Sequence, residues 1–241
     1  MQADPLAKEK NGSEQLFDRI HARYDLLNHL LTFRLDLLWR KRAAQRIAAE
    51  FPASVAPEIL DLASGTGDMA LAVRRKVRTA GLTIADASES MLKVAMNKLL
   101  ARECCVQMSV EDAASLSFRD ATFDCITIAF GVRNFPQLDQ SLKECLRVLK
   151  PGGKLFVLEF GWPGNPLLSF LYRIYSATVI PLMGMLVAGD RKAYRYLTRT
   201  IRSFPYGSAF NDRMIHAGFE PCAFEKYAAG IVYLYQAAVP E

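Results

Sequence analysis

The residues best suited to chemistry lie in a glycine-containing loop with an acid at each end. The loop, DLASGTGD, begins at Asp61 and ends at Asp68. Its glycines, Gly65 and Gly67, let the backbone turn tightly and come close to a ligand. The two acids would repel a pyrophosphate, but they suit a ligand with positive charges, such as the ammonium and sulfonium of S-adenosylmethionine. Ala70 stands at the third glycine position of a dinucleotide loop, so the loop alone leaves NAD open.

Two further acids follow at the spacing of a nucleoside site. Asp86 lies about 20 residues beyond the loop, where a carboxylate accepts hydrogen bonds from both ribose hydroxyls. Asp112 follows the next predicted strand and can bind an adenine amino group, with the N–H of Ala113 as partner for the ring. All three elements lie at the carboxyl ends of predicted strands, where open α/β sheets bind ligands. Together they predict a site for S-adenosylmethionine rather than scattered surface acids.

Short apolar segments alternate with helical patterns from residue 58 onward, which predicts a parallel sheet with right-handed crossovers. Two final apolar segments, 219–227 and 231–239, predict a closing antiparallel hairpin. The expected fold is therefore α/β: a Rossmann-like class I S-adenosylmethionine-dependent methyltransferase with a mostly parallel seven-stranded sheet. The other predicted strands are 59–62, 82–86, 106–110, 123–130 and 154–159, and the helices between them are 68–78, 88–101 and 138–149.

The 241 residues fit a single domain. We divide it into an N-terminal helical cap (1–50), a cofactor-binding core (51–160), a helical substrate cover (161–205) and the closing hairpin (206–241).

The cap carries a polar helix face. His21, Tyr24, Asp25 and Asn28 share that face by spacing, so they could cover an active site. His21 is a candidate general base because the histidine pKa lies near neutral pH. Neither His29 nor His216 has a supporting context.

The overall charge is mildly basic, at +5 with an isoelectric point near 9.0. It is compatible with contact at an anionic membrane surface and does not require nucleic acid. The apolar segment 174–189 is shorter than the roughly 20 residues of a membrane span and contains Pro181, so we expect it to be buried or interfacial. Five cysteines without metal spacing and an N-terminus without a signal peptide favour a cytoplasmic protein, with optional peripheral contact at the inner face of the cell membrane.

Longer motifs resemble one family. The chain from residue 17 to 235 resembles the ubiquinone/menaquinone biosynthesis C-methyltransferases (UbiE/MenG type), which include the demethylmenaquinone methyltransferases. The most specific parts are two constellations, Tyr24-Asp25-Asn28 and Gly131-Arg133-Asn134. The longer matching stretches read FDRIHARYDLLNHLLTFRLDLLWR (17–40), RVLKPGGKLFVLEF (147–160) and DRKAYRYLTRTIRSFP (190–205).

The resemblance implies methylation of a ring carbon of a prenylated quinol. That quinol is demethylmenaquinol, or the 2-methoxy-6-polyprenyl-1,4-benzoquinol of the ubiquinone route. By position, the family's cofactor contacts fall on Thr66, Asp86, Asp112, Ala113 and Ala129. At the last of these the family often has serine, so only a backbone contact is expected here.

The resemblance also implies which residues act on the quinol. Arg133 and Asn134 are expected at the rim of the site, where the arginine would stabilise a phenolate-like oxygen, because arginine keeps its proton. Tyr24, Asp25 and Asn28 are expected to complete the catalytic group. No metal is expected. Two positions depart from the family pattern: Arg34 and Asp36 stand where glycine and histidine are usual.

The segment 166–201 interrupts the strand–helix alternation and is rich in Leu, Met, Tyr and Pro. It could form an apolar groove for an isoprenoid tail, with Tyr194 and Tyr196 against the ring, or simply cover the sheet. A homo-oligomer is compatible with the sequence.

Three other functions stay open. The nearest is an O- or N-methyltransferase for another small molecule or lipid, which would share the fold and the cofactor site. A nucleic-acid methyltransferase is disfavoured, because the loop after the strand 123–130 lacks an Asn/Asp-Pro-Pro-aromatic motif and no arginine-rich arm is present. A binding protein without activity would not need these motifs.

Overall fold

The computed structural model describes residue 25, residues 27–183, residue 185 and residues 198–241. Tyr24, His21, Tyr194 and Tyr196 therefore lie outside the described residues.

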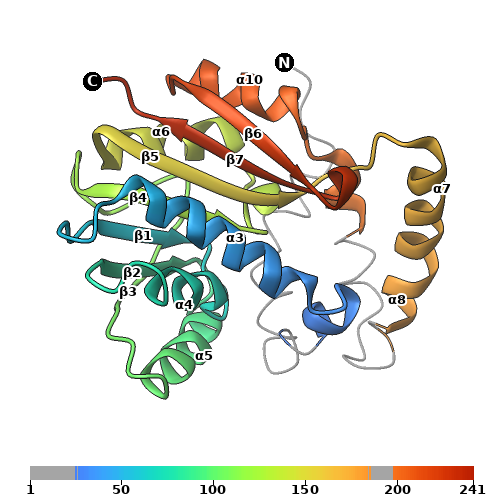
Figure 1. Cartoon of the computed structure of the whole chain (residues 1–241), viewed down its shortest axis with the longest axis horizontal. Coiled ribbons are helices and arrows are strands. Elements are labelled where there is room, and N and C mark those ends of the chain that lie inside the picture. Colours follow the sequence, from blue (N-terminus) through green and yellow to red (C-terminus); the bar gives the residue numbers. More distant parts are fainter. Residues whose placement is uncertain (1–24, 26, 184, 186–197) are drawn as a thin grey trace.

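A seven-stranded sheet forms the centre of the molecule, in the order β3-β2-β1-β4-β5-β7-β6 (Figure 1). The first five strands pair in parallel, whereas β7 runs antiparallel to both of its neighbours. The predicted parallel sheet with a closing hairpin is confirmed. The strands are β1 (Glu58–Leu62), β2 (Gly81–Asp86), β3 (Gln107–Val110), β4 (Phe123–Ala129), β5 (Leu149–Phe160), β6 (Cys222–Tyr227) and β7 (Val232–Ala238).

Helices cover both faces of this sheet, and alternate strand residues point into two separate apolar cores. Ile59 of β1 packs with α3, α4 and α5, whereas its neighbour Leu60 packs with α6 and α10. Burial on both faces explains why the central strands are nearly continuous apolar runs. The helices are α3 (Leu35–Glu50), α4 (Asp68–Arg74), α5 (Glu89–Leu100), α6 (Leu138–Val148) and α10 (Ser208–Ala217).

A helical column stands beside the sheet at one end of the molecule (Figure 1). It consists of α7 (Pro166–Ile174), a π-helical turn η2 (Tyr175–Val179) and α8 (Ile180–Met183). Asn165 caps its start by accepting a hydrogen bond from the Leu168 N–H at 3.1 Å, and Pro166 occupies the first turn. Among the described residues, the stretch Pro166–Met183 is long and apolar enough to cross a membrane, and only 17% of it is buried inside the molecule.

The predicted elements differ from the structure at a missed helix and at one strand boundary. The sequence analysis assigned no helix to 208–217, where α10 lies. It began the fifth strand at residue 154, although β5 begins at Leu149. Within the N-terminal cap, a turn at 32–34 separates α3 from the helical residues that precede it. In that turn, Arg34 adopts a left-handed conformation with φ 61°, which glycine would adopt at lower cost.

Candidate active site

The glycine loop joins β1 to α4 and places its polar groups at the carboxyl end of the sheet. Gly65 has φ 53° and Gly67 has φ 81°, both in the left-handed region that favours glycine. A Cβ on Gly67 would lie 3.1 Å from the Ala95 Cβ, so this glycine lets the loop pack on α5. Gly67, also expected at the cofactor site, is not among the residues that line the cavity described below.

Asp61 lies at the inner end of this loop and is almost completely buried. Its carboxylate accepts hydrogen bonds from the Thr127 hydroxyl at 2.7 Å and from the Ala70 N–H at 3.0 Å. Burial raises the pKa of Asp61 to about 7, although both hydrogen bonds favour the ionised form. A cationic group placed beside it would draw the proton off and restore the negative charge.

Asp86 closes the same loop from the next strand. Its two oxygens accept hydrogen bonds from the Gly65 N–H at 2.8 Å and the Ser88 N–H at 3.0 Å. These bonds fix the carboxylate at the end of β2, where a ribose would lie in a nucleoside site.

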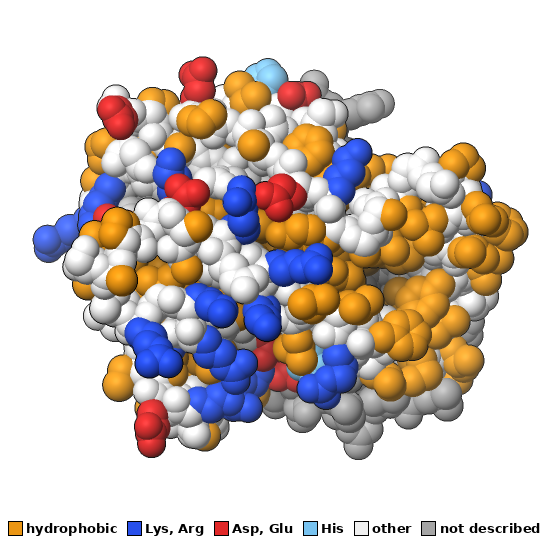
Figure 2. All heavy atoms as spheres, in the orientation of Figure 1, with side chains coloured by type: hydrophobic (Ala, Val, Ile, Leu, Met, Phe, Trp, Pro, Cys, Tyr) orange, Lys and Arg blue, Asp and Glu red, His pale blue; other side chains and the backbone are white. Residues whose placement is uncertain are grey.

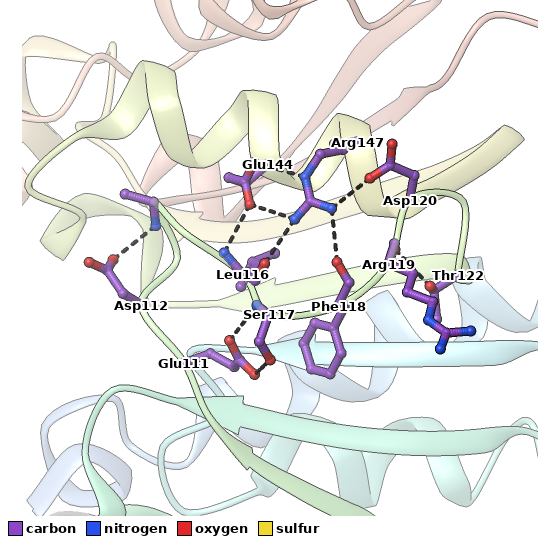
Figure 3. A network of polar contacts seen from close by, with 11 residues as sticks. Glu111, Asp112, Leu116, Ser117, Phe118, Arg119, Asp120, Thr122, Glu144 and Arg147 are labelled. Carbon is purple, nitrogen blue, oxygen red and sulfur yellow. Dashed lines mark hydrogen bonds and ion pairs between the residues drawn. The ribbon is translucent and has the colours of Figure 1, made fainter.

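Asp112 and Ala113 lie on a loop that a separate polar network holds in place (Figure 3). Glu111 is buried at the base of the loop and accepts hydrogen bonds from the Ser109 and Ser117 hydroxyls and from the Ser117 N–H. Asp112 itself accepts a hydrogen bond from the Ala114 N–H at 2.9 Å. Both acids line the cavity described below, and Glu111 also holds the loop in its conformation.

Arg147 anchors the far side of this loop to α6. It donates to the carbonyl oxygens of Leu116 and Phe118, each at 2.8 Å, and pairs with Asp120 and Glu144 at 2.7 Å (Figure 3). The hydrogen bonds from Arg147 are the main reason that the pKa of Glu144 lies below its ordinary value. The first residue of the RVLKPGG motif is thus a support for the loop that carries Asp112.

The loops after β1, β2, β3 and β4 enclose a cavity of about 310 Å³ at the carboxyl ends of these strands, which we call the first cavity. Its polar end near α4 also contains Ser64, whose buried hydroxyl has no hydrogen-bond partner among the described residues. Of the residues predicted from the sequence, the first cavity is lined by Asp61, Gly65, Thr66, Asp86, Asp112, Ala113, Ala129 and Asn134.

Gly131 explains how two of these loops meet. A Cβ at this position would lie 2.6 Å from the Ala63 Cβ, closer than side-chain atoms approach, so only glycine lets the loop after β4 touch the loop after β1. This contact gives a structural reason for the glycine of the Gly131-Arg133-Asn134 constellation.

A charged network joins the N-terminal cap to the first cavity. Asp25 accepts hydrogen bonds from the Thr66 hydroxyl and the Lys98 ammonium, and Lys98 also pairs with Asp68 at 2.9 Å. Burial opposes ionisation of Asp68, but Arg40 and Lys98 outweigh it, so the pKa of Asp68 lies below its ordinary value. Asp25, expected in the catalytic group, therefore contacts the glycine loop through Thr66.

His29 belongs to the same network, which corrects the sequence analysis. Its Nδ1 lies 2.8 Å from Asp36 and its Nε2 lies 3.7 Å from Asp68. Asp36 is buried and also accepts a hydrogen bond from the Thr32 hydroxyl. One nitrogen or oxygen atom each of His29, Asp36 and Asp68 lies within 4.8 Å of the others, a spacing that could hold a metal ion. The Lys98 ammonium that pairs with Asp68 opposes a further cation there.

A second cavity, of about 300 Å³, lies beside the first and is mostly apolar. Segments far apart in sequence form it, and the Tyr175 hydroxyl ties two of them together by donating to the Leu31 carbonyl at 2.6 Å. Asn28 lines this second cavity. The apolar walls are formed by Leu31, Phe33, Leu35, Trp39, Phe130, Phe160, Leu168, Leu171, Ile180, Ile201, Ala228 and Ile231.

Arg133 lines the second cavity. The sequence analysis expected it at the rim of the cofactor site, but it is not among the residues that line the first cavity. The side chain is buried and pairs with the fully buried Glu159 at 2.7 Å. It also donates to the Phe130 carbonyl and lies over the Phe160 ring, 5.5 Å from its centroid. Its Nε is buried without a partner among the described residues. Asn134, next in sequence, faces the first cavity instead.

Arg40 and Phe130 line both cavities and form the boundary between them. The Arg40 guanidinium lies 4.9 Å from the centre of the Phe130 ring. Two of its nitrogens, Nε and Nη1, are buried without a hydrogen-bond partner in the described part of the chain. Unpaired buried guanidinium nitrogens are costly, which is typical of a group that awaits an anionic ligand. The sequence analysis did not single out Arg40, although it is the last residue of the matching stretch 17–40.

Comparison with known proteins agrees with this geometry. The model of the ubiE/COQ5 methyltransferase family matches residues 6–238. A ubiquinone/menaquinone biosynthesis C-methyltransferase UbiE from Hahella chejuensis is 38% identical over 96% of this chain and 92% of its own. A demethylmenaquinone methyltransferase from Bacteroides fragilis is 39% identical over 95% of this chain and 93% of its own.

Among solved structures, an S-adenosylmethionine-dependent methyltransferase from Thermotoga maritima superposes with a TM-score of 0.65. It covers 93% of this chain and 98% of its own, at 19% sequence identity. That likeness confirms the predicted class I methyltransferase fold.

Proposed function

The chain belongs to the ubiE/COQ5 methyltransferase family, and from this premise we propose that it methylates a ring carbon of a prenylated quinol. The protein is an S-adenosylmethionine-dependent C-methyltransferase of quinone biosynthesis. The observation that carries the proposal is the pair of adjoining cavities. One is polar and shaped by nucleoside-binding loops, the other is apolar, and they meet at Arg40 and Phe130.

The residues of the first cavity fit the methyl donor. Asp86 would hold the ribose, and Asp112 with the Ala113 N–H would hold the adenine. Thr66 and Asp61 lie at the opposite, polar end, where the amino-acid part would bind, and Ala129 offers only its backbone there. When bound, the donor supplies an electrophilic methyl group on a sulfonium.

Arg40 would bind the carboxylate of the donor's amino-acid part. It lies at the same end of the first cavity as Thr66 and Asp68, and its unpaired nitrogens need an anionic acceptor. Asp61 would then face the ammonium, so the two ends of the zwitterion meet opposite charges.

The second cavity would hold the quinol ring and the first part of its tail. A quinol carbon becomes nucleophilic when the neighbouring hydroxyl loses its proton. Arg133 would stabilise the resulting oxygen anion as a fixed hydrogen-bond donor in an apolar site. Glu159 holds Arg133 in place. Phe130 and Phe160, whose ring centroids are 4.5 Å apart, would exclude water from the transfer.

Asn134 and Asn28 would position the reactants from opposite sides of the boundary. Asn134 faces the first cavity and Asn28 the second. Tyr24 is a further candidate by its place in the family motif.

The test is methyl transfer from labelled S-adenosylmethionine to short-tailed demethylmenaquinol and to the methoxy-benzoquinol, measured side by side. We expect the label on a ring carbon of demethylmenaquinol at least, as identified by fragmentation of the product. Arg133→Lys keeps a charge opposite Glu159 but loses the planar fork, and should lower kcat by about a hundredfold. Arg119→Lys is the matched surface control and should leave kcat unchanged.

Two results would refute the proposal. One is tight binding of S-adenosylhomocysteine with no methylation of either quinol. The other is label on oxygen, which would favour the alternative of an O-methyltransferase for a lipidic acceptor.

A further inference from the structure

The exposed face of the helical column carries an unusual amount of apolar surface. Leu167 is 68% exposed and Phe170 is 57% exposed, and Leu171 and Ile174 continue the same face at helical spacing. Farther along the column, Val179, Leu182 and Met185 are also exposed. No residue of α7 is buried in the protein. An apolar surface of this extent marks an interaction site in a soluble-type fold.

This surface is continuous with the mouth of the second cavity. Leu171 belongs to both, since it is exposed on α7 and also lines the second cavity. Phe33, which is 77% exposed, lies across from the column, with its ring 6.4 Å from that of Tyr175. Figure 2 shows hydrophobic side chains gathered where Figure 1 places α7 and α8, with a hollow between them and the body of the molecule.

The described residues around the column carry charge of one sign. From Phe160 to Met183 and from Thr198 to Asn211, the described charged side chains are Arg173, in the last turn of α7, and the exposed Arg199 and Arg202. Arg202 lies over the Trp162 ring, 5.6 Å from its centroid, at the base of α7. An apolar helix face bordered by basic residues matches an anionic lipid surface. The electrostatic attraction to such a surface is about 1 kcal/mol for each Lys or Arg near it.

The column is placed to lie on a bilayer and not to cross it. Its other side faces protein, because Leu168, Tyr172 and Ile180 line the second cavity. Tyr172 also packs its ring against Trp162, at 5.0 Å between centroids. A spanning helix would be surrounded by lipid on all sides, whereas a helix with one apolar exposed face lies in the interface.

We propose that the exposed face of α7 to α8 docks on the surface of an anionic lipid bilayer, so that a lipid tail passes from the membrane directly into the second cavity. The docking site consists of Leu167, Phe170, Leu171, Ile174, Leu182 and the rim residue Phe33. The tail's route rests on the proposed function, but docking itself does not. Because the cavity mouth opens on the docked face, the tail never crosses water.

The first measurement is flotation of the full chain with vesicles of mixed phosphatidylglycerol and phosphatidylcholine. The test variant is Leu167→Ser/Phe170→Ser, since neither residue lines the second cavity. The control is Leu100→Ser/Ile215→Ser, which removes similarly exposed side chains from α5 and α10. We expect the test variant to lose at least about tenfold in vesicle affinity and the control to bind like the unmodified chain.

The second measurement compares kcat/KM for a water-soluble short-tailed quinol and for a long-tailed quinol embedded in the same vesicles. The test variant should retain the short-tailed activity, which shows that it is folded, and should lose the long-tailed activity. Failure of all methylation would refute the proposed function yet leave the flotation result intact.

Unchanged flotation of the test variant would overturn the docking proposal. So would a change from dimer to monomer in solution without a change in vesicle binding, because the face would then be an interface between copies of the chain. Equal loss of both quinol activities with normal flotation would assign these side chains to the catalytic site instead.

Discussion

The carboxyl of Asp61 is enclosed by the ends of β1 and β4, and burial raises its pKa from 3.8 to about 7. Between pH 4 and 7 the folded protein therefore keeps a proton that the unfolded chain has released. The free energy of unfolding falls as the pH rises through that window and stays lower above it. A buried acid that lowers stability near neutral pH is typical of a functional site, here one that would balance a cation.

Asp61→Asn should separate the effect of the buried carboxyl on stability from its effect on the binding of a cationic ligand. The amide oxygen can still accept from the Ala70 N–H, and the Thr127 hydroxyl can rotate to accept from the new NH2 group. We expect the variant to be more stable than the unmodified protein by about 2–4 kcal/mol at pH 8 and equal near pH 4. Its affinity for S-adenosylhomocysteine should fall about tenfold or more at pH 8.

Thermal unfolding and calorimetric titration across that pH range measure both quantities. The affinity of the unmodified protein should also weaken below pH 7, because the proton must leave Asp61 when the ammonium binds. A variant that is less stable at pH 8, or that binds the ligand normally, contradicts this role.

Arg40 allows an equally specific test through the choice of ligand. Methylthioadenosine lacks the amino-acid part of the donor, whereas S-adenosylhomocysteine retains it. Arg40→Leu should lower the affinity for S-adenosylhomocysteine by about tenfold to a hundredfold and leave the affinity for methylthioadenosine unchanged. Arg102→Leu, at an exposed position just after the end of α5, is the control. If quinol KM rises instead while both nucleosides bind normally, Arg40 belongs to the quinol site.

At the level of elements, the strands with both faces buried could be predicted. Burial of both faces makes such a strand a continuous apolar run in the sequence. β5 began earlier than expected because Pro151, Gly152 and Gly153 resemble a break. In the structure Leu149 pairs with Phe123 and Lys154 with Cys125, so the intervening residues form an irregularity within the strand. α10 was missed because only Phe210 and Met214 of its ten residues are buried, which leaves a weak helical pattern.

The loop after β3 shows how one element depends on another. Asp112 and Ala113 were predictable from their place after a strand, but the support of their loop by Arg147 of α6 joins positions about 30 residues apart. Arg147→Met should lower the free energy of unfolding by about 1–2 kcal/mol, because two carbonyls and two carboxylates lose their partner.

The same change should lower the affinity for S-adenosylhomocysteine a few-fold, because the loop it loosens lies at the adenine end of the first cavity. Thermal unfolding and titration measure these effects. Arg119→Met is the matched control, because the Arg119 guanidinium makes no hydrogen bond in the described part of the chain. Equal effects in both variants would mean that the anchoring of the loop is unimportant.

At the scale of the whole molecule, the second cavity could not be predicted, because it exists only where distant segments meet. Leu31 and Tyr175 are joined by a hydrogen bond across 144 residues. Arg133 was identified by motif, but its burial against Glu159 depends on the pairing of β4 with β5. Arg40 lies on α3, which the sequence indicated only as part of a cap, and its position between the cavities follows from how α3 packs on the sheet.

The central claim is that a methyl group crosses the boundary formed by Arg40 and Phe130. A crystal structure with S-adenosylhomocysteine and a short-tailed quinol bound together tests it most directly. We predict the thioether sulfur in the first cavity, and the quinol ring in the second with one oxygen within hydrogen-bond distance of Arg133. A quinol ring bound outside the second cavity, or one with no ring carbon facing the sulfur, would contradict the account.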